Sequence, residues 1–196
     1  MLGVAILAGG AGKRMGGLDK GLCLYQGVSF IDHVIAEIEF QARFLDEPVQ
    51  IVISANRNID VYKKNGVPVV TDLRGGCSDF QGPLAGIEAV LSYGVTHQVS
   101  HWIVVPVDSI RLPSNYLQGL IATQLQGSQK QVVVMSVLGI RHYSHLYLQG
   151  SKLASIKHYL DRGGRSIKGW VAGCGHTFVG MNLKDSNLLN VNSGNV

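Results

Sequence analysis

Short apolar runs alternate along this chain with segments whose apolar residues recur at helical spacing, and this alternation constrains the fold most strongly. Residues 2–7 are continuously apolar, which is typical of a short buried strand. Helices are expected after Ser29, which opens a capping box, from Gly82 to about Ser92, and from Pro113. Further strands are expected at residues 49–54, 67–71, 102–107 and 131–138. This order predicts an α/β fold with a mainly parallel central sheet and helices on both faces.

The pattern loosens beyond Gly139. Residues 141–148 alternate as a strand does, residues 152–160 have helical spacing, and a last short strand is expected at Leu188–Val191. The 196 residues contain no internal repeat, low-complexity segment or Pro-rich linker. A single domain, residues 1–196, is therefore expected.

Composition and charge exclude several classes of function. The net charge is +4 and the cations are scattered, so the clustered basic patch of a nucleic-acid-binding protein is absent. The longest apolar stretches are too short to span a bilayer. Three cysteines without C-x-x-C spacing favour neither a disulfide framework nor zinc. The H-x-x-H pair His142 and His145 is expected on opposite sides of a strand, without a third ligand nearby. We expect a cytoplasmic protein with no membrane segment.

A glycine-rich loop follows the first expected strand. Its sequence, LAGGAGKRMGGLDK from Leu7 to Lys20, contains five glycines and three cations. A Walker A loop fails because Leu7 and Arg14 occupy the positions of the first glycine and of the hydroxyl. A dinucleotide fingerprint fails at Met15, and the second strand does not end in an acid. A loop that binds a nucleoside triphosphate for nucleotidyl transfer fits best.

Charged side chains suited to this chemistry follow from the same pattern. Arg14 offers a fork for phosphate oxygens, and Lys20 offers a point charge. Asp108 follows the buried strand that ends near Val107, where a metal-binding carboxylate is expected. In such sheets ligands bind beyond the carboxyl ends of the strands, where the glycine loop, Ser54, Asp72 and Asp108 all fall.

These residues resemble the molybdenum cofactor guanylyltransferase family, a group of nucleotidyltransferases with a three-layer Rossmann-like fold. The resemblance covers essentially the whole chain, and its N-terminal part is highly specific. The matching segments are Leu7–Gly10, Arg14–Gly17, Asp19–Gly21, Ile53–Arg57, Thr71–Asp72, Gly82–Gly86, Asp108 and Leu189–Asn192.

The resemblance implies that GMP is transferred from GTP to molybdopterin with release of pyrophosphate. It implies that residues up to about 110 bind the nucleotide and that the remainder serves the acceptor. Mg²⁺, or Mn²⁺ in its place, would be held by Asp108. Proteins that deliver molybdopterin, and apo-molybdoenzymes that receive the product, are implied partners. The implied site residues are Leu7, Ala8, Gly9, Gly10, Arg14, Lys20, Ser54, Asp72 and Asp108 for the nucleotide, with Arg14, Lys20 and Asp108 catalytic, and Asn190 and Asn192 on the pterin side.

Alternatives stay open because the chain departs from the family pattern. The family's Pro-Cys-Asp-Thr-Pro is Pro106–Ile110 here, and its His-Pro segment is His142–His145. Related cytidylyltransferases have Ala-Ala-Gly where this chain has Ala8-Gly9-Gly10, and glycine at position 9 leaves room for a purine, so guanine is favoured. A CTP-dependent enzyme, a sugar-phosphate nucleotidyltransferase and a non-catalytic nucleotide-binding homologue are the alternatives.

Overall fold

The central element of the protein, in a computed structural model, is a seven-stranded sheet with the order β5-β4-β1-β6-β8-β7-β9. The structure describes residues 1–10, 18–74, 81–126 and 132–181. The strands are β1 (Leu2–Leu7), β4 (Val49–Ser54), β5 (Val69–Val70), β6 (His101–Pro106), β7 (Val132–Val137), β8 (Ile140–Gln149) and β9 (His176–Gly180). A separate two-stranded hairpin pairs β2 (Leu24–Tyr25) with β3 (Val28–Ser29).

The pairing in this sheet is parallel except at β8. Strand β1 lies in the interior of the sheet, where it pairs in parallel with β4 on one side and with β6 on the other. Strand β8 runs antiparallel to both β6 and β7. The carboxyl ends of β1, β4 and β6 therefore lie together at one edge of the sheet, where Leu7, Ser54 and Pro106 are aligned.

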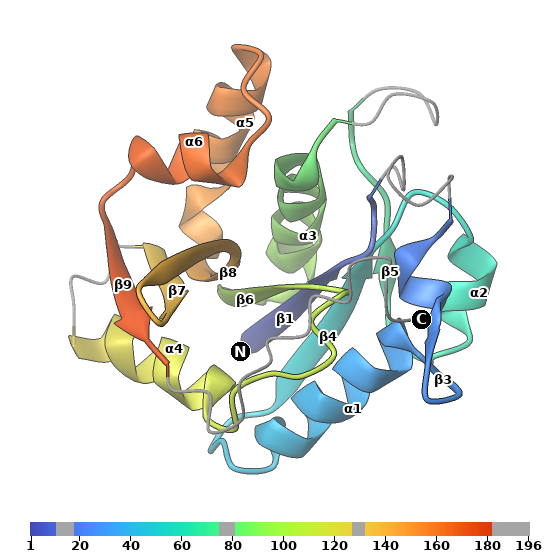
Figure 1. Ribbon diagram of the computed structural model, residues 1–196. Coiled ribbons are helices and arrows are strands. Elements are labelled where there is room, and N and C mark those ends of the chain that lie inside the picture. The colour runs from blue at the N-terminus through green and yellow to red at the C-terminus, as the bar shows by residue number, and fades with distance from the viewer. Residues whose placement is uncertain (11–17, 75–80, 127–131, 182–196) are drawn as a thin grey trace.

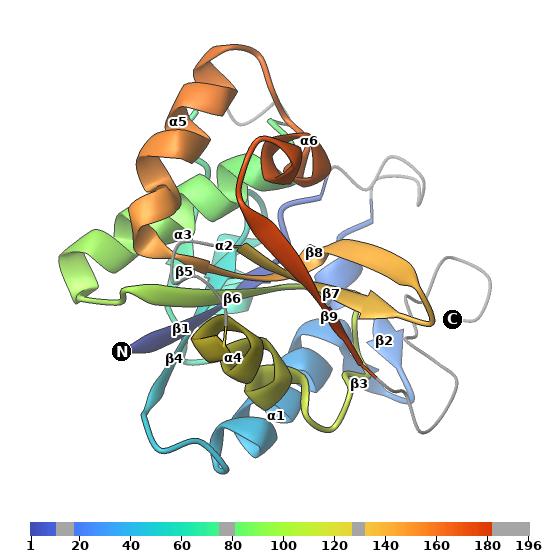
Figure 2. The same ribbon diagram turned by 90° about the vertical axis from the view of Figure 1, so that its left-hand side faces the viewer.

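Helices cover both faces of the sheet (Figures 1 and 2). One face packs against α1 (Phe30–Ala42) and α4 (Tyr116–Gln126), and the other against α3 (Pro83–His97), α5 (Leu153–Asp161) and α6 (Ile167–Ala172). The short α2 (Ile59–Lys63) contributes Tyr62 to the core on the α1 side. Two 3-10 turns complete the described structure, η2 (Lys20–Leu22) and η3 (Gly150–Lys152). The expected three-layer α/β architecture is confirmed.

Local sequence explains why the larger elements form where they do. The Ser29 hydroxyl accepts a hydrogen bond from the Asp32 amide, which caps α1 as the capping-box pattern predicts. At the start of α3, Gly82 has φ +81°, a conformation open mainly to glycine, and Pro83 occupies the first turn, where no amide donor is needed.

Several elements were missed or misplaced by the sequence patterns. The hairpin β2–β3, helices α2 and α6, and strand β9 were not expected, because each has only two to six residues and too few apolar repeats to show a period. Helix α3 continues to His97 rather than ending near Ser92, and α4 begins at Tyr116 rather than at Pro113. The strand expected at Leu188–Val191 lies outside the described residues.

Candidate active site

A close ion pair marks the carboxyl edge of the sheet. The Lys20 ammonium nitrogen donates to Oδ2 of Asp108 at 2.6 Å. Lys20 belongs to η2, just after the glycine-rich loop, whereas Asp108 follows β6. The two side chains keep about a quarter and a fifth of their surface exposed, so the pair remains accessible from solvent. The structure thus brings together two of the three residues expected to be catalytic.

Asp19 holds the backbone that carries Lys20. The residue is 9% exposed, and its carboxylate caps η2 by accepting from the Gly21 backbone amide at 3.2 Å. The same carboxylate accepts from the Tyr62 hydroxyl at 2.6 Å and from the Asn58 amide at 2.9 Å. Burial and the adjacent carboxylate raise the pKa of Tyr62, so its hydroxyl stays a proton donor at neutral pH. The Asp-Lys sequence therefore separates into a buried anchor and an accessible cation.

Gly21 is required by this anchor. A Cβ at position 21 would lie 2.3 Å from the Tyr62 hydroxyl oxygen, which no side chain tolerates without displacement. The Asp-Lys-Gly order is thus explained as an anchor, a cation and a close backbone approach.

Arg57 joins the two ends of the glycine-rich loop. One guanidinium nitrogen donates to the Gly10 carbonyl at 3.2 Å and to the Leu18 carbonyl at 2.8 Å. These carbonyls flank residues 11–17, which lie outside the described part of the chain. The guanidinium also lies 3.8 Å from the Asp19 carboxylate. Sequence patterns gave Arg57 no role, since only the fold places it beside the loop.

An amide–carboxylate pair lies next to the first loop glycine. Asn56 donates to Oδ2 of Asp72 at 2.9 Å and accepts from the Asp72 amide at 2.8 Å. Burial, more than offsetting the Asn56 hydrogen bond, raises the pKa of Asp72. A Cβ at Gly9 would lie 3.2 Å from the Asn56 side-chain nitrogen. The Asn56 side chain therefore leaves little space for a side chain at position 9, whereas a Cβ at Gly10 would meet open space.

Ser54 lies at the end of β4 but faces the protein interior. It is 1% exposed, and its carbonyl accepts from the Ala8 amide at 2.8 Å. A Cβ at Gly86 would come within 2.5 Å of its hydroxyl oxygen. The side chain thus packs against the first turn of α3, which Gly86 allows to approach the sheet closely. The described surface near the loop is formed by Asn56 rather than by Ser54.

Asp108 sits on a tight turn fixed from both sides. The Val107 amide donates to the Leu7 carbonyl of β1, and the Ser109 amide donates to the Pro106 carbonyl. Val107 and Ser109 are both buried. The carboxylate of Asp108 accepts from Lys20, so the turn presents a hard oxygen donor at a defined place.

The remaining expected site residues divide into two groups. Leu7 and Ala8 lie at the end of β1 and just beyond it, at the same edge as Asp108. Arg14, Asn190 and Asn192 lie outside the described residues, as does Cys77. Cys23 and Cys174 are free thiols.

Arg74 is already engaged and is not a spare cation at this edge. Its guanidinium donates two hydrogen bonds to the buried Glu88 carboxylate, at 2.5 and 2.8 Å, and one to the Asp161 carboxylate at 2.5 Å. These carboxylates raise its pKa further. Arg74 therefore ties the segment after Asp72 to α3 and α5.

The expectation that His142 and His145 face opposite sides was wrong. Between the pairs Val134↔Leu146 and Met135↔His142, β8 advances four residues while β7 advances one. This bulge resets the side-chain alternation, so the two imidazole centroids lie 6.1 Å apart. Within the described ranges, no group of three His, Cys, Asp or Glu residues could hold a metal ion.

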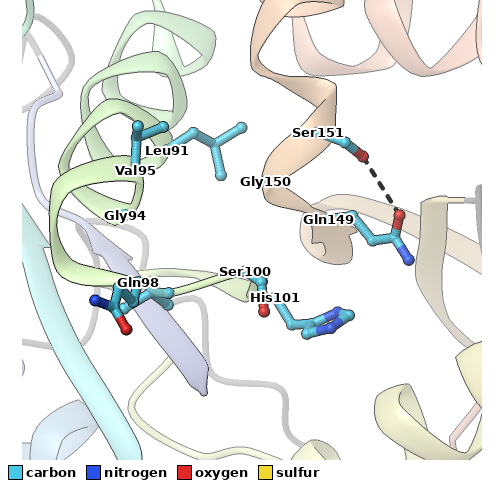
Figure 3. Close-up of a pocket in the computed structure, with 10 residues that line it drawn as sticks. Leu91, Gly94, Val95, Gln98, Ser100, His101, Gln149, Gly150 and Ser151 are labelled. Carbon is cyan, nitrogen blue, oxygen red and sulfur yellow. Dashed lines mark hydrogen bonds between the residues drawn. The ribbon is translucent and has the colours of Figure 1, made fainter.

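A hollow lies at the opposite end of the strands, away from Lys20 and Asp108 (Figure 3). It is bordered by the last turns of α3, the start of β6 and the end of β8. Leu91, Val95, His101 and Gln149 are among its lining residues. None of the expected site residues borders it.

No helix formed by the described residues is both long and apolar enough to cross a membrane.

Named proteins from other organisms are similar to this chain over most of its length. The chain is 36% identical over 186 residues to "Molybdenum cofactor guanylyltransferase" of Cupriavidus metallidurans, covering 92% of this chain and 84% of that one. It is 34% identical to the protein of the same name from Shewanella piezotolerans, over 96% and 86% of the two chains.

A solved structure agrees with the fold. Molybdopterin-guanine dinucleotide biosynthesis protein A from Archaeoglobus fulgidus superimposes with a TM-score of 0.68 and 19% identity, covering 91% of this chain and 83% of that one. The family described as "MobA-like NTP transferase domain" matches residues 4–173, which include the loop, Lys20 and Asp108. The chain belongs to the MobA-like NTP transferase family.

Proposed function

We propose that this protein transfers GMP from GTP to molybdopterin and releases pyrophosphate. The observation that carries the proposal is the Lys20–Asp108 pair at the carboxyl ends of β1 and β6, the end of the sheet at which Gly9 and Gly10 follow β1. Cation, carboxylate and exposed backbone amides are the groups that nucleotidyl transfer requires. The names of the relatives support the choice of GTP and molybdopterin.

The nucleotide half consists of residues up to about 110. Backbone groups of Leu7 to Gly10 would line the base and phosphates, and the Lys20 ammonium would neutralise phosphate charge. Arg57 would hold the loop ends in register through Gly10 and Leu18. Arg14 is assigned to the triphosphate from the family motif, and Asp72 to a nucleotide contact beside Asn56.

Asp108 is the residue that would hold Mg²⁺, or Mn²⁺ in its place. A single carboxylate suits Mg²⁺, which in proteins commonly takes one or two carboxylates and completes its shell with substrate phosphates and water. The oxygen donor is hard, partly exposed and next to Lys20. When bound, the ion would supply charge neutralisation on the triphosphate. Lys20 donates to the same carboxylate at 2.6 Å, so the cation and the proposed metal ligand lie side by side.

The acceptor half would be formed by the remainder of the chain. The first part of strand β8, before Leu146 pairs with Val104, extends beyond the carboxyl end of its pairing with β6. This part carries Arg141 and Tyr143. The Arg141 guanidinium lies 4.3 Å from the centre of the Phe178 ring, and Tyr143 packs edge to face against the same ring. Aromatic rings beside a cation suit a flat heterocycle that carries a phosphate. Asn190 and Asn192 are assigned to this side from the family motif.

The reaction follows from these positions. A phosphate oxygen of molybdopterin attacks the α-phosphorus of GTP, and the bond from that phosphorus to the bridging oxygen breaks. The electron pair leaves with pyrophosphate, whose charge Lys20 and Arg14 would neutralise.

Proteins that deliver molybdopterin and apo-molybdoenzymes that receive the product are implied partners. Free thiols at Cys23 and Cys174 support action in the reducing cytoplasm.

The test is pyrophosphate release with GTP, Mg²⁺ and molybdopterin. Release should require all three, and omission of molybdopterin should abolish it. Replacement of GTP by CTP or UTP should lower kcat/KM, and a preference for CTP would make the protein a cytidylyltransferase. Release with a sugar phosphate but not with molybdopterin would favour that class of acceptor. Tight GTP binding without release would identify a non-catalytic homologue.

A further inference from the structure

A chain of buried hydrogen bonds connects the Asp108 turn to the acceptor half of the protein. The Ser109 hydroxyl lies 3.0 Å from Nε2 of His145, and Nδ1 of His145 lies 3.1 Å from the Tyr116 hydroxyl. The Tyr116 hydroxyl donates to the Val104 carbonyl at 2.9 Å. All three side chains are at most 1% exposed. The chain spans the turn after β6, strand β8 and helix α4.

For a neutral His145 ring, only one proton arrangement satisfies all of these contacts. A carbonyl can only accept, so the single Tyr116 proton goes to Val104. The Tyr116 oxygen must then accept a proton from Nδ1 of His145, and Nε2 must accept from Ser109. His145 is therefore the neutral Nδ1–H tautomer. Burial and the nearby His142 lower the pKa of His145 to about 3, which agrees with a neutral ring.

Two distant segments of the chain meet in this contact. Ser109 belongs to the turn that directly follows Asp108, and His145 belongs to β8. Leu146 still faces the α3 side, so ordinary alternation turns His145 toward Tyr116 on the α4 side. Ser109 and His145, which are 36 positions apart in the chain, thus form one hydrogen bond in the structure.

We propose that His145 is a positioning residue that fixes the Asp108 turn through Ser109. The inference rests on the proposed function, in which Asp108 holds the metal. Ser109 directly follows Asp108, and its amide already closes the turn onto Pro106. Its side-chain bond to His145 adds a second anchor that reaches across from the acceptor half. A carboxylate displaced by a fraction of an ångström would hold the metal away from its productive place at the triphosphate, so this anchor acts on turnover rather than on GTP affinity.

The variants Ser109→Ala, His145→Phe and their combination test the proposal. Phenylalanine fills the imidazole site, and Tyr116 keeps its bond to Val104. The double variant leaves no polar group of the Ser109–His145 contact without its partner. We expect each single variant to lower kcat about 10- to 100-fold, as small misplacements do, and to raise the Mg²⁺ concentration for half-maximal rate. The double variant should be no more active than either single one, and KM for GTP should stay within about threefold, less than the effect on kcat.

Tyr147→Phe is the matched control. Its hydroxyl bonds Nδ1 of His101 at 2.6 Å, which is the same chemistry on the same strand but at the far end of β6. It should keep wild-type kcat and Mg²⁺ dependence. Equal losses in Tyr147→Phe, wild-type kcat in the folded Ser109→Ala variant, or full recovery in the double variant would overturn the proposal.

Nitrogen-15 NMR of the imidazole gives a readout independent of turnover. We expect a protonated Nδ1 and an unprotonated Nε2 in the intact protein at pH 7, with the Nε2 resonance shifted in Ser109→Ala. The opposite tautomer would overturn the assignment. If Asp108→Ala retained pyrophosphate release, the proposed role of Asp108 would fail while the tautomer result still stood, so the two failures are distinguishable.

Discussion

The Lys20 ammonium lies 2.6 Å from Oδ2 of Asp108, although 88 positions separate the two residues in the chain. Each side chain is held by backbone that is itself anchored, Lys20 through Asp19 and Asp108 through the turn between β6 and Ser109. The pair joins the loop after β1 to the loop after β6. It defines the point at which a phosphate and a metal could be placed together.

Asp108→Asn should fold and lose turnover by about 10²–10³ or more, because one preorganised electrostatic partner of the reaction is removed. Lys20→Met should lower turnover as well, with a larger effect on kcat than on KM for GTP. Pyrophosphate release under saturating GTP and Mg²⁺ measures both. The control is Asp60→Asn, which removes an exposed carboxylate paired with Lys63 at 3.6 Å. Undiminished release by Asp108→Asn would contradict the assignment.

Tyr62→Phe should destabilise the protein by about 1.5–3 kcal/mol, the range for hydrogen bonds to charged groups. The variant removes the 2.6 Å bond to Asp19 but leaves the Gly21 and Asn58 donors in place. Asp19→Ala should cost more, because three donors lose their acceptor, and it alone should reduce turnover by releasing Lys20. Urea unfolding and pyrophosphate release distinguish the two effects. Equal losses of stability in the two variants would contradict this account.

Gly86→Ala should destabilise the protein by about 1–3 kcal/mol, the usual cost of overpacking. The new methyl would lie 2.5 Å from the Ser54 hydroxyl oxygen. Adding Ser54→Ala removes that atom and should recover part of the loss, which a double-mutant cycle in urea measures. Ser54→Ala alone should leave KM for GTP near the wild-type value, since Ser54 is 1% exposed. A large rise in KM would instead place its hydroxyl at the nucleotide.

The stability contributed by neutral His145 should disappear in acid. Its pKa in the folded protein is about 3, below the ordinary value of 6.5, so the full contribution is present above pH 6.5 and is lost as the pH falls toward 3. Between these limits the unfolding free energy should fall by about 1.4 kcal/mol per pH unit relative to His145→Phe. Ser109, Tyr116 and His142 face the ring, and none supplies a negative charge. A pH-independent difference between the two proteins would contradict a buried neutral imidazole.

The sequence predicted the architecture well because burial on both faces leaves a strong signal. Strands β1, β4, β6, β7 and β8 appear as apolar or alternating runs, and their boundaries differ from the expected ones by no more than one residue. Short elements and edge strands were not predicted, since a five-residue strand such as β9 or a helix such as α2 carries too few apolar positions to establish a period. The bulge in β8 was not predicted either, because strand register depends on the partner strand.

The sequence by itself determined the residue types of the site and the sheet edge at which they lie. Lys20, Asp72 and Asp108 were predicted as site residues from loop chemistry and from the rule that ligands bind beyond strand carboxyl ends. Only the tertiary structure decided which side chains are presented and which are buried. It turned Ser54 under α3, made Asp19 an anchor, and brought Arg57 to the loop and His145 to Ser109. The physical reason is that spacing along the chain specifies an element and its periodicity. Contacts between distant elements depend on packing distances and strand register, which no local pattern contains.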